Sequence, residues 1–336
     1  MDTTQALELC SLAEAADSGL IGLDAAEWRG RLDSSAPELR SALEWLLERD
    51  QAAALRMATA LAGFWRISGQ MPEGRLWLDR TLAVADANDP ALPRALYEDG
   101  MLAFWQGDAA AMSLFERSLE SATRLHDPTG EAVAICGIAR VALREGDLER
   151  ARLQCRDALD RVRGTDDRLG RSNALHLLGV SAQMRGDFIE ARGFMTERME
   201  LARQLGHISS VASEASNLSV VERQLGNLER AQELALESLQ LSDRRGDEWS
   251  IPFDLNSLAG IAAAGRDFER AAKLLGAAAA LMDRMEMAWP PDEKPHFDRT
   301  RGSAEAALAP EVFRAAWSEG GQMSASQAVE FASAAP

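Results

Sequence analysis

The sequence predicts an all-α fold in which about six helical hairpins stack into a solenoid. A Gly-Asp-like turn followed four residues later by alanine recurs with a period of 40 residues, as in Gly146-Asp147-Leu148-Glu149-Arg150-Ala151. A fixed period of this length is typical of a solenoid, in which each unit buries its apolar face against its neighbours. Apolar residues spaced three and four apart dominate, and β-branched runs with a period of two are absent, which favours helices over strands.

Each hairpin is predicted by small residues on either side of a turn. The six turns begin at Gly69, Gly107, Gly146, Gly186, Gly226 and, with arginine in the glycine position, Arg266. Seven residues before each turn lies another small residue, at Ala62, Gly100, Ala139, Gly179, Ser219 and Ala259. Because small residues let two helix backbones approach closely, this arrangement predicts an antiparallel helix pair around each turn.

These patterns divide the chain into three regions. We expect N-terminal helices that cap the array over residues 1–50, six repeats over residues 51–284, and a proline-containing loop with C-terminal capping helices over residues 285–336. Caps are needed because the terminal repeats of a solenoid otherwise expose apolar faces. The predicted breaks between hairpins are Asp89-Pro90, Asp127-Pro128, Gly164-Thr165-Asp166-Asp167, Gly206-His207 and Gly246-Asp247.

Local signals predict helix boundaries in the two end regions. The run Ser35-Ala36-Pro37-Glu38 has the form of a capping box, so a helix is expected to start near Ser35. Three prolines between residues 290 and 295 predict a loop. Ser324 is expected to cap a last helix that runs to about Ala335.

Composition and missing motifs exclude several functional classes. With 53 acidic and 36 basic residues the formal net charge is −17, so we expect no direct contact with nucleic acid or an anionic membrane. No stretch reaches the roughly 18 apolar residues of a membrane span, which predicts a cytoplasmic protein. No paired carboxylates, serine elbow or phosphate-binding loop stands out, which argues against an enzyme. The three cysteines lack C-x-x-C spacing, and neither a metal site nor a cofactor is expected.

The hairpin signature is similar to the tetratricopeptide repeat. The matching residues are Asn217-Leu218-Ser219 and Leu178-Gly179 in first helices, and Ala191 and Ala231 after the turns. The period of 40 exceeds the usual period of about 34, which implies longer helices or connections. HEAT-type repeats also have a period near 40, but the small pairs that bracket each Gly-Asp turn favour the tetratricopeptide-like alternative.

Further motifs occur in order along most of the chain. They are Ser41-Ala42-Leu43-Glu44-Trp45, Phe64-Trp65, Glu73-Gly74-Arg75-Leu76-Trp77-Leu78, Arg270-Ala271-Ala272-Lys273-Leu274-Leu275-Gly276-Ala277-Ala278, and Phe313-Arg314-Ala315-Ala316-Trp317-Ser318-Glu319-Gly320 followed by Ala328-Val329. Together they resemble the C-terminal helical arm of large bacterial ATPase transcriptional regulators, many of them LuxR-type. The resemblance implies ATPase and DNA-binding domains elsewhere in a longer chain, because these residues contain neither a nucleotide-binding loop nor a basic recognition helix.

The tetratricopeptide resemblance also implies which side chains line the concave groove. In such a stack the inner face is lined by first-helix residues at fixed offsets from the small residue. Arginine offers a rigid donor fork and aromatic rings offer stacking area, so the groove suits a peptide, a protein or a small polar effector. The predicted groove residues are Arg94, Tyr97, Arg140, Arg144, Asn173, His176, Arg223 and Asn256, together with Trp105, Cys136, Gln183, Ser216 and Phe253.

The histidines do not indicate chemistry. His176 is predicted to face the groove, but no partner lies at metal or triad spacing from it. His126, His207 and His296 are expected to be ordinary surface residues. The leading hypothesis is therefore a non-catalytic sensor and interaction arm of a cytoplasmic LuxR-type regulator, and the alternative is a stand-alone adaptor that scaffolds two proteins.

Overall fold

The structure is a computed structural model that describes residues 1–163, 167–290 and 293–334, and every regular element in these ranges is an α-helix. The predicted all-α fold class is therefore confirmed. Within the same ranges each helix is too short or too polar to span a lipid bilayer. Three predicted features lie outside the described residues: most of the break at Gly164–Asp167, the proline at 291, and the end of the last helix at Ala335.

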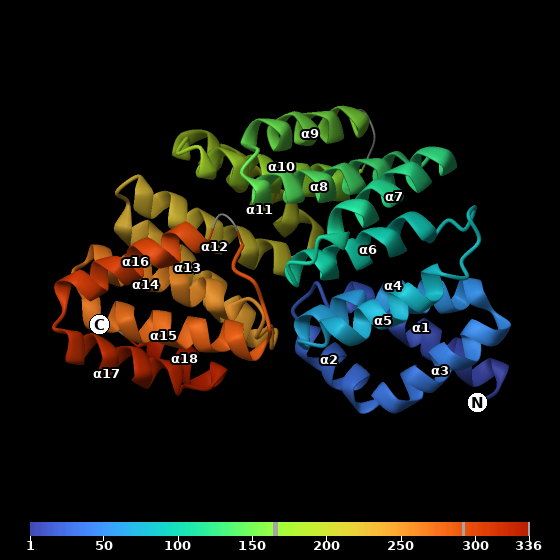
Figure 1. The fold of residues 1–336 in the computed structure, drawn as a ribbon, viewed down its shortest axis with the longest axis horizontal. Coiled ribbons are helices and arrows are strands. Elements are labelled where there is room, and N and C mark those ends of the chain that lie inside the picture. The colour runs from blue at the N-terminus through green and yellow to red at the C-terminus, as the bar shows by residue number, and fades with distance from the viewer. Residues whose placement is uncertain (164–166, 291–292, 335–336) are drawn as a thin grey trace. The chain divides into compact units, whose positions relative to one another are not determined.

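The chain forms two compact units, Met1–Leu177 and Leu178–Pro336 (Figure 1). The helices of the first unit are α1 (Thr3–Gly19), α2 (Ala25–Ser34), α3 (Ala36–Arg49), α4 (Gln51–Ile67), α5 (Met71–Leu82), α6 (Leu92–Trp105), α7 (Ala110–Leu125), α8 (Pro128–Glu145), α9 (Leu148–Arg161) and the start of α10 (Arg168–Met184). Those of the second unit are the end of α10, α11 (Phe188–Leu205), α12 (Ile208–Gln224), α13 (Leu228–Arg244), α14 (Ile251–Ala264), α15 (Phe268–Arg284), α16 (Lys294–Ala307), α17 (Pro310–Gly321) and α18 (Ala325–Ser333).

Consecutive helices pack as hairpins, and the hairpins stack. Helix α4 packs on α5, α6 on α7, α8 on α9, α12 on α13, and α14 on α15. The first helices of successive hairpins also contact one another, α6 with α4 and α8 in the first unit and α12 with α14 in the second. These first helices form what we call the first-helix face of each unit.

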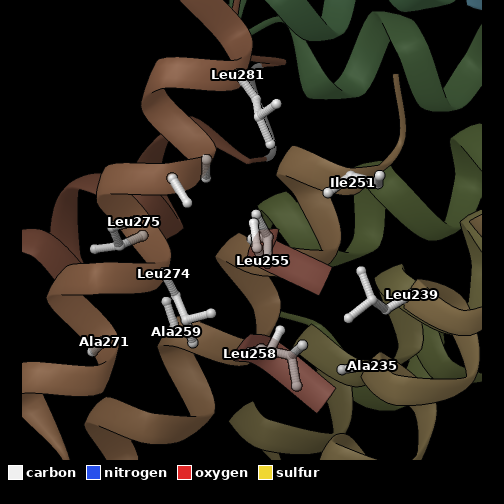
Figure 2. Close-up of a cluster of buried hydrophobic side chains, with 14 of the residues drawn as sticks. Ala235, Leu239, Ile251, Leu255, Leu258, Ala259, Ala271, Leu274, Leu275 and Leu281 are labelled. Atoms are coloured by element: carbon white, nitrogen blue, oxygen red, sulfur yellow. The ribbon is translucent and has the colours of Figure 1, made fainter. Parts of the chain in front are cut away.

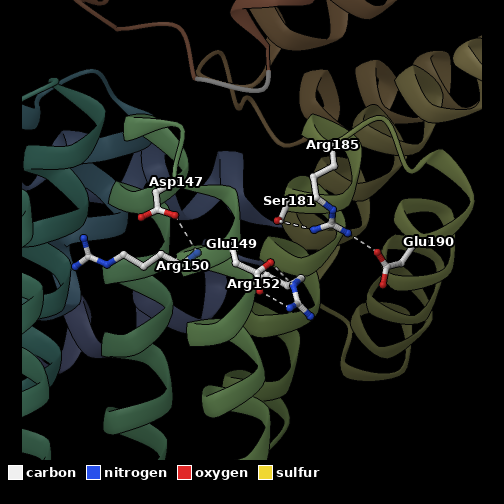
Figure 3. Close-up of polar contacts among 7 residues, drawn as sticks. All are labelled: Asp147, Glu149, Arg150, Arg152, Ser181, Arg185 and Glu190. Carbon is white, nitrogen blue, oxygen red and sulfur yellow. Dashed lines mark hydrogen bonds and ion pairs between the residues drawn. The ribbon is translucent and has the colours of Figure 1, made fainter.

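The recurring Gly-Asp turn has a conformational and a hydrogen-bonding cause. Each turn glycine has a positive φ, for example 81° at Gly146, and Arg266 has a φ of 67° in the same place. In three of the turns the aspartate after the left-handed residue caps the next helix. A carboxylate oxygen of Asp147 accepts from the backbone nitrogen of Arg150 at 3.0 Å (Figure 3), and Asp267 accepts in the same way from Arg270 at 3.1 Å. Glycine tolerates the left-handed conformation and aspartate satisfies a free amide, so the pair both stops one helix and starts another.

Small residues lie where the two helices of a hairpin meet. A Cβ atom added to Gly100 of α6 would lie 2.7 Å from Cε1 of Phe115, which belongs to α7. A Cβ added to Gly179 of α10 would lie 2.8 Å from Cγ of Met195 on α11. The predicted small residues therefore make room for a large side chain of the partner helix.

One hydrophobic cluster of the second unit lies between α13, α14 and α15 (Figure 2). Leu239, Leu255 and Leu274 contribute from these three helices and are completely buried. Phe297 of α16 and Ala328 of α18 belong to the same cluster, so the C-terminal helices cover the last hairpin.

Two glycines bring α15 and α17 into backbone contact. A Cβ added to Gly276 would clash with the carbonyl of Trp317, and one added to Gly320 would clash with the carbonyl of Lys273. Both glycines belong to the motifs that resemble a regulator arm, so these motifs have a packing role here.

Two boundary predictions need correction. Helix α3 starts at Ala36 as expected, but Ser35 forms no capping hydrogen bond because its φ and ψ of −101° and 7° are not extended, as a capping side chain requires. Pro295 lies not in a loop but in the first turn of α16, where its missing N–H group costs nothing. The cap at Ser324 is confirmed: its Oγ accepts from the backbone nitrogen of Gln327 at 3.2 Å.

Candidate functional site

The predicted groove residues lie on the first helices of both units. Arg94 and Tyr97 are on α6, Arg140 and Arg144 on α8, Asn173 and His176 on α10, Arg223 on α12, and Asn256 on α14. In the first unit they remain at least partly exposed, whereas in the second unit Asn256 is buried and Arg223 partly buried.

Tyr97 and Arg140 interact between α6 and α8. Burial raises the pKa of Tyr97 to about 12, and the Arg140 guanidinium opposes this shift through its charge and a hydrogen bond. The tyrosine ring also contacts Phe115, with 5.6 Å between ring centres. The phenol is thus a fixed, neutral group beside a guanidinium.

Arg144 lies one helical turn from Arg140, and its guanidinium carbon is 3.5 Å from the centre of the Phe104 ring. Burial lowers the pKa of Arg144. Two nitrogens of this pair, Nε of Arg140 and Nη2 of Arg144, are buried and have no hydrogen-bond partner among the described residues. An unpaired buried donor is costly, and an anionic oxygen placed there would offset that cost. The pair therefore forms a candidate anion site.

Arg94, another predicted groove residue of the first unit, pairs with acidic side chains. Arg94 is exposed and points its donors to acidic residues, bonding to Asp17 of α1 at 2.6 Å and lying 3.7 Å from Glu98. Asn173 and His176 are half-buried on α10. The guanidinium group of Arg94 is thus already paired with acidic side chains of α1 and α6.

In the second unit the predicted groove residues are covered by the chain itself. The side chain of Asn256 donates from Nδ2 to Oε2 of Glu293 at 2.6 Å, and both residues are buried. Arg223 packs across α14, where a Cβ added to Gly260 would lie 3.0 Å from its Nε atom. Burial and the charge of Arg299 lower the pKa of Arg223, while the charge of Glu293 raises it.

His296 is not the surface residue that the sequence predicts. It is only 8% exposed, and Arg299 donates from Nη2 to its Nδ1 at 2.6 Å. Since Nδ1 accepts, a neutral ring carries its proton on Nε2, which lies 3.3 Å from the amide nitrogen of Gln183. A hydrogen bond between the two side chains then requires the Gln183 amide group to be turned so that its oxygen accepts. Burial and the charges of Arg223 and Arg299 lower the pKa of His296 to about 3, so the ring stays neutral. No local pattern could reveal this, because Gln183 is 113 residues away.

A cavity of about 260 Å³ lies between α11, α12 and α13 of the second unit. The sequence does not predict it, because its lining residues come from three helices and share no local motif. Its lining combines two arginines and two glutamates with three apolar side chains. Its lining residues are Thr196, Met199, Glu200, Arg203, Leu218, Glu222, Arg230 and Leu234.

The described residues offer little for metal or thiol chemistry. Within them no group of three or more histidine, cysteine, aspartate or glutamate side chains could hold a metal ion. All three cysteines are buried thiols. Burial raises the pKa of Cys10 to about 11 and that of Cys136 to about 12, so both remain protonated at neutral pH.

Comparison with known proteins supports the fold. No protein-family model matches the chain, and no curated protein sequence matches it. Among solved structures, a Rap protein complexed with competence and sporulation factor gives a TM-score of 0.61 at 14% identity, over 93% of this chain and 85% of that one. The fold is a tetratricopeptide-like solenoid.

Two further solved structures are similar in part. The anaphase-promoting complex hetero-tetramer Cut9-Hcn1 gives a TM-score of 0.52 at 13% identity, over 89% of this chain and 49% of that one. BtubC (BKLC) from P. vanneervenii gives a TM-score of 0.48 at 24% identity, over 62% of this chain and 87% of that one.

Proposed function

We propose that this chain is a non-catalytic interaction arm that binds an acidic group of a peptide or protein on the first-helix face of its first unit. The observation that carries the proposal is the pair Arg140 and Arg144, each with a buried guanidinium nitrogen that has no hydrogen-bond partner among the described residues. Arginine presents a planar fork that matches a carboxylate. The tetratricopeptide-like fold supports the proposal because stacked hairpins present an extended surface.

The surroundings of the two arginines favour a small, localised anion. Phe104 lies against the Arg144 guanidinium and Tyr97 against Arg140, so both forks are held in place before a ligand arrives. Fixing a side chain in advance lowers the entropy cost of binding. The chain as a whole carries a net charge of −17, which repels a polyanion. The ligand that fits best is therefore a peptide that places one carboxylate against the two guanidinium groups. A small effector that carries a carboxylate would be bound by the same interactions.

The sequence motifs support a more specific role as the sensor arm of a LuxR-type ATPase transcriptional regulator in the cytoplasm. The two motifs that contain Gly276 and Gly320 pack on each other, so they form one structural element. In this role, the regulator would exist in two conformational states, and the ligand would bind the arm more tightly in one of them. Binding would therefore shift the ATPase core, and through it the DNA-binding domain, toward that state.

A stand-alone adaptor is the second candidate function. An adaptor needs two separate surfaces, and the cavity between α11, α12 and α13 is a second surface made of other residues. Arg203 and Arg230 on its wall would contact one partner while the first unit holds another.

Native mass spectrometry of the endogenous protein distinguishes the two candidates. A chain far heavier than 36.5 kDa is expected for a regulator arm, and the extra mass should include a nucleotide-binding domain. A chain near 36.5 kDa that carries a bound protein is expected for an adaptor. Turnover of a substrate by the purified chain would contradict both.

A further inference from the structure

We propose that the C-terminal segment is an internal ligand that occupies a peptide-binding surface on the first-helix face of the second unit. The segment consists here of Trp289, Pro290 and residues 293–299. The surface would take a peptide with an aromatic residue and an acidic residue four positions later, as in Trp289 and Glu293. The inference rests on the proposed function only in treating the first-helix face as an interaction surface, and it concerns other residues.

The polar half of the contact resembles recognition of a carboxylate. Glu293 is 4% exposed, and its Oε2 accepts a 2.6 Å hydrogen bond from Nδ2 of Asn256, which is 2% exposed. The charge of Glu293 also acts on Arg223 of α12. Asn256 and Arg223 are two of the groove residues that the tetratricopeptide resemblance predicts for this unit. A buried acidic side chain of the chain thus lies where the carboxylate of a partner is expected.

The apolar half of the contact is a series of aromatic rings. Trp289 lies with its ring centre 6.0 Å from that of Phe253, which belongs to α14 and is itself a predicted groove residue. The Trp289 ring is also 4.7 Å from that of Phe297, which lies 6.1 Å from Trp317 of α17. Such ring pairs stabilise a contact beyond the effect of the area they bury. The tryptophan therefore anchors the segment to the first-helix face.

The internal ligand leaves two hydrogen-bonding atoms of the surface without partners among the described residues. They are Nε of Arg223 and Oδ1 of Asn256, and both are buried. A neutral His296 also lies close to two guanidinium groups, those of Arg223 and Arg299, and contributes no negative charge to offset them. A partner peptide that brings a second acceptor to Arg223 would make contacts that the internal segment does not make. We therefore expect a peptide that supplies this acceptor to compete with the segment for the surface.

The test uses the full chain and a fluorescein-labelled synthetic peptide with the sequence of residues 286–299. In the chain, Trp289→Ala together with Glu293→Gln weakens the internal contact without touching the surface. Fluorescence anisotropy should show the peptide binding this double variant at least tenfold more tightly than the wild-type chain. A peptide that carries the same two substitutions is the matched control and should not bind.

Two further variants locate the binding. Adding Asn256→Leu to the double variant should remove the gain in peptide affinity. Adding Arg140→Glu and Arg144→Glu instead should leave that gain unchanged. That difference separates this inference from the proposed function of the first unit. If Trp289→Ala unfolds the chain, as circular dichroism would reveal, Glu293→Gln alone keeps the shape of the side chain and should still give a measurable gain.

Several results would overturn the proposal. They are equal affinity for the wild-type and weakened chains, binding that survives Asn256→Leu, and no binding to either chain.

Discussion

The hydroxyl of Ser238 donates a 2.6 Å hydrogen bond to the carboxylate of Asp254, which is 1% exposed between α12, α13 and α14. Ser242 donates to the other carboxylate oxygen at 3.0 Å. Burial raises the pKa of Asp254 to about 7, and the charge of Asp247 raises it further, while the serine hydroxyls oppose the shift. The second unit therefore contains a buried carboxyl group that titrates near neutral pH.

This carboxyl group should make stability depend on pH. Its folded pKa lies above the unfolded value of about 3.9, so the folded state binds more protons between roughly pH 4 and pH 7. The free energy of unfolding contributed by this group therefore falls as pH rises through that window, by a few kcal/mol at most. Asp254→Asn removes the titrating group. Urea denaturation should therefore show that the free energy of unfolding falls less between pH 5 and pH 8 in this variant than in the wild type.

The exposed Asp243→Asn is the control for this titration. It should follow the wild-type pH dependence, because Asp243 lies on the surface of α13. A parallel loss of stability in Asp254→Asn and the wild type would show that the buried carboxyl group is not responsible.

The turn at Arg266 should be improved by glycine. Arg266 has a φ of 67°, a conformation that costs an L-residue roughly 1 kcal/mol and glycine almost nothing. Arg266→Gly should raise the free energy of unfolding by about 1 kcal/mol. The reciprocal change Gly226→Arg, at a φ of 87°, should lower it by a similar amount. Chemical denaturation measures both, and a loss of stability in Arg266→Gly would contradict the assignment.

The hairpin contact at Gly100 should not tolerate a methyl group. An added Cβ would lie 2.7 Å from the ring of Phe115, which is fully buried, so the ring must shift. Gly100→Ala is expected to destabilise the chain by about 1–3 kcal/mol. Gly193→Ala in α11 is the matched control, because an added Cβ meets nothing within 4 Å there and alanine favours a helix. A gain of stability in both variants would mean that Gly100 does not serve close helix packing.

The turns could be predicted from the sequence because their requirements are local. A left-handed residue followed by a capping side chain involves only neighbours along the chain, so Gly146 and Asp147 carry their own signal. Even Arg266 could be placed by its position in the period, although arginine does not favour the conformation. Asn256 and Arg223 lie on the first helices α14 and α12, and their role as groove residues stays a prediction.

The occupancy of that face could not be predicted, because it depends on contacts between distant residues. Glu293 is 37 residues from Asn256, and His296 is 113 residues from Gln183. Read alone, the proline-containing stretch suggests an exposed loop, since three prolines are typical of one. Packing of Trp289 and Phe297 decides otherwise. Arg94 illustrates the same limit, because its partner Asp17 lies in a helix outside the repeats.

The most direct test of the central claim is retention of the endogenous bound species by charge-reversal variants, measured by native mass spectrometry of protein from its own host. The double variant Arg140→Glu/Arg144→Glu is compared with the wild type and with Arg156→Glu, which reverses an exposed charge on the second helix of the same hairpin. We predict that the wild type and Arg156→Glu retain the species, while the double variant loses at least nine-tenths of it, roughly the tenfold change of 1.4 kcal/mol. Equal retention by all three proteins, or no bound species on the wild type, would contradict it.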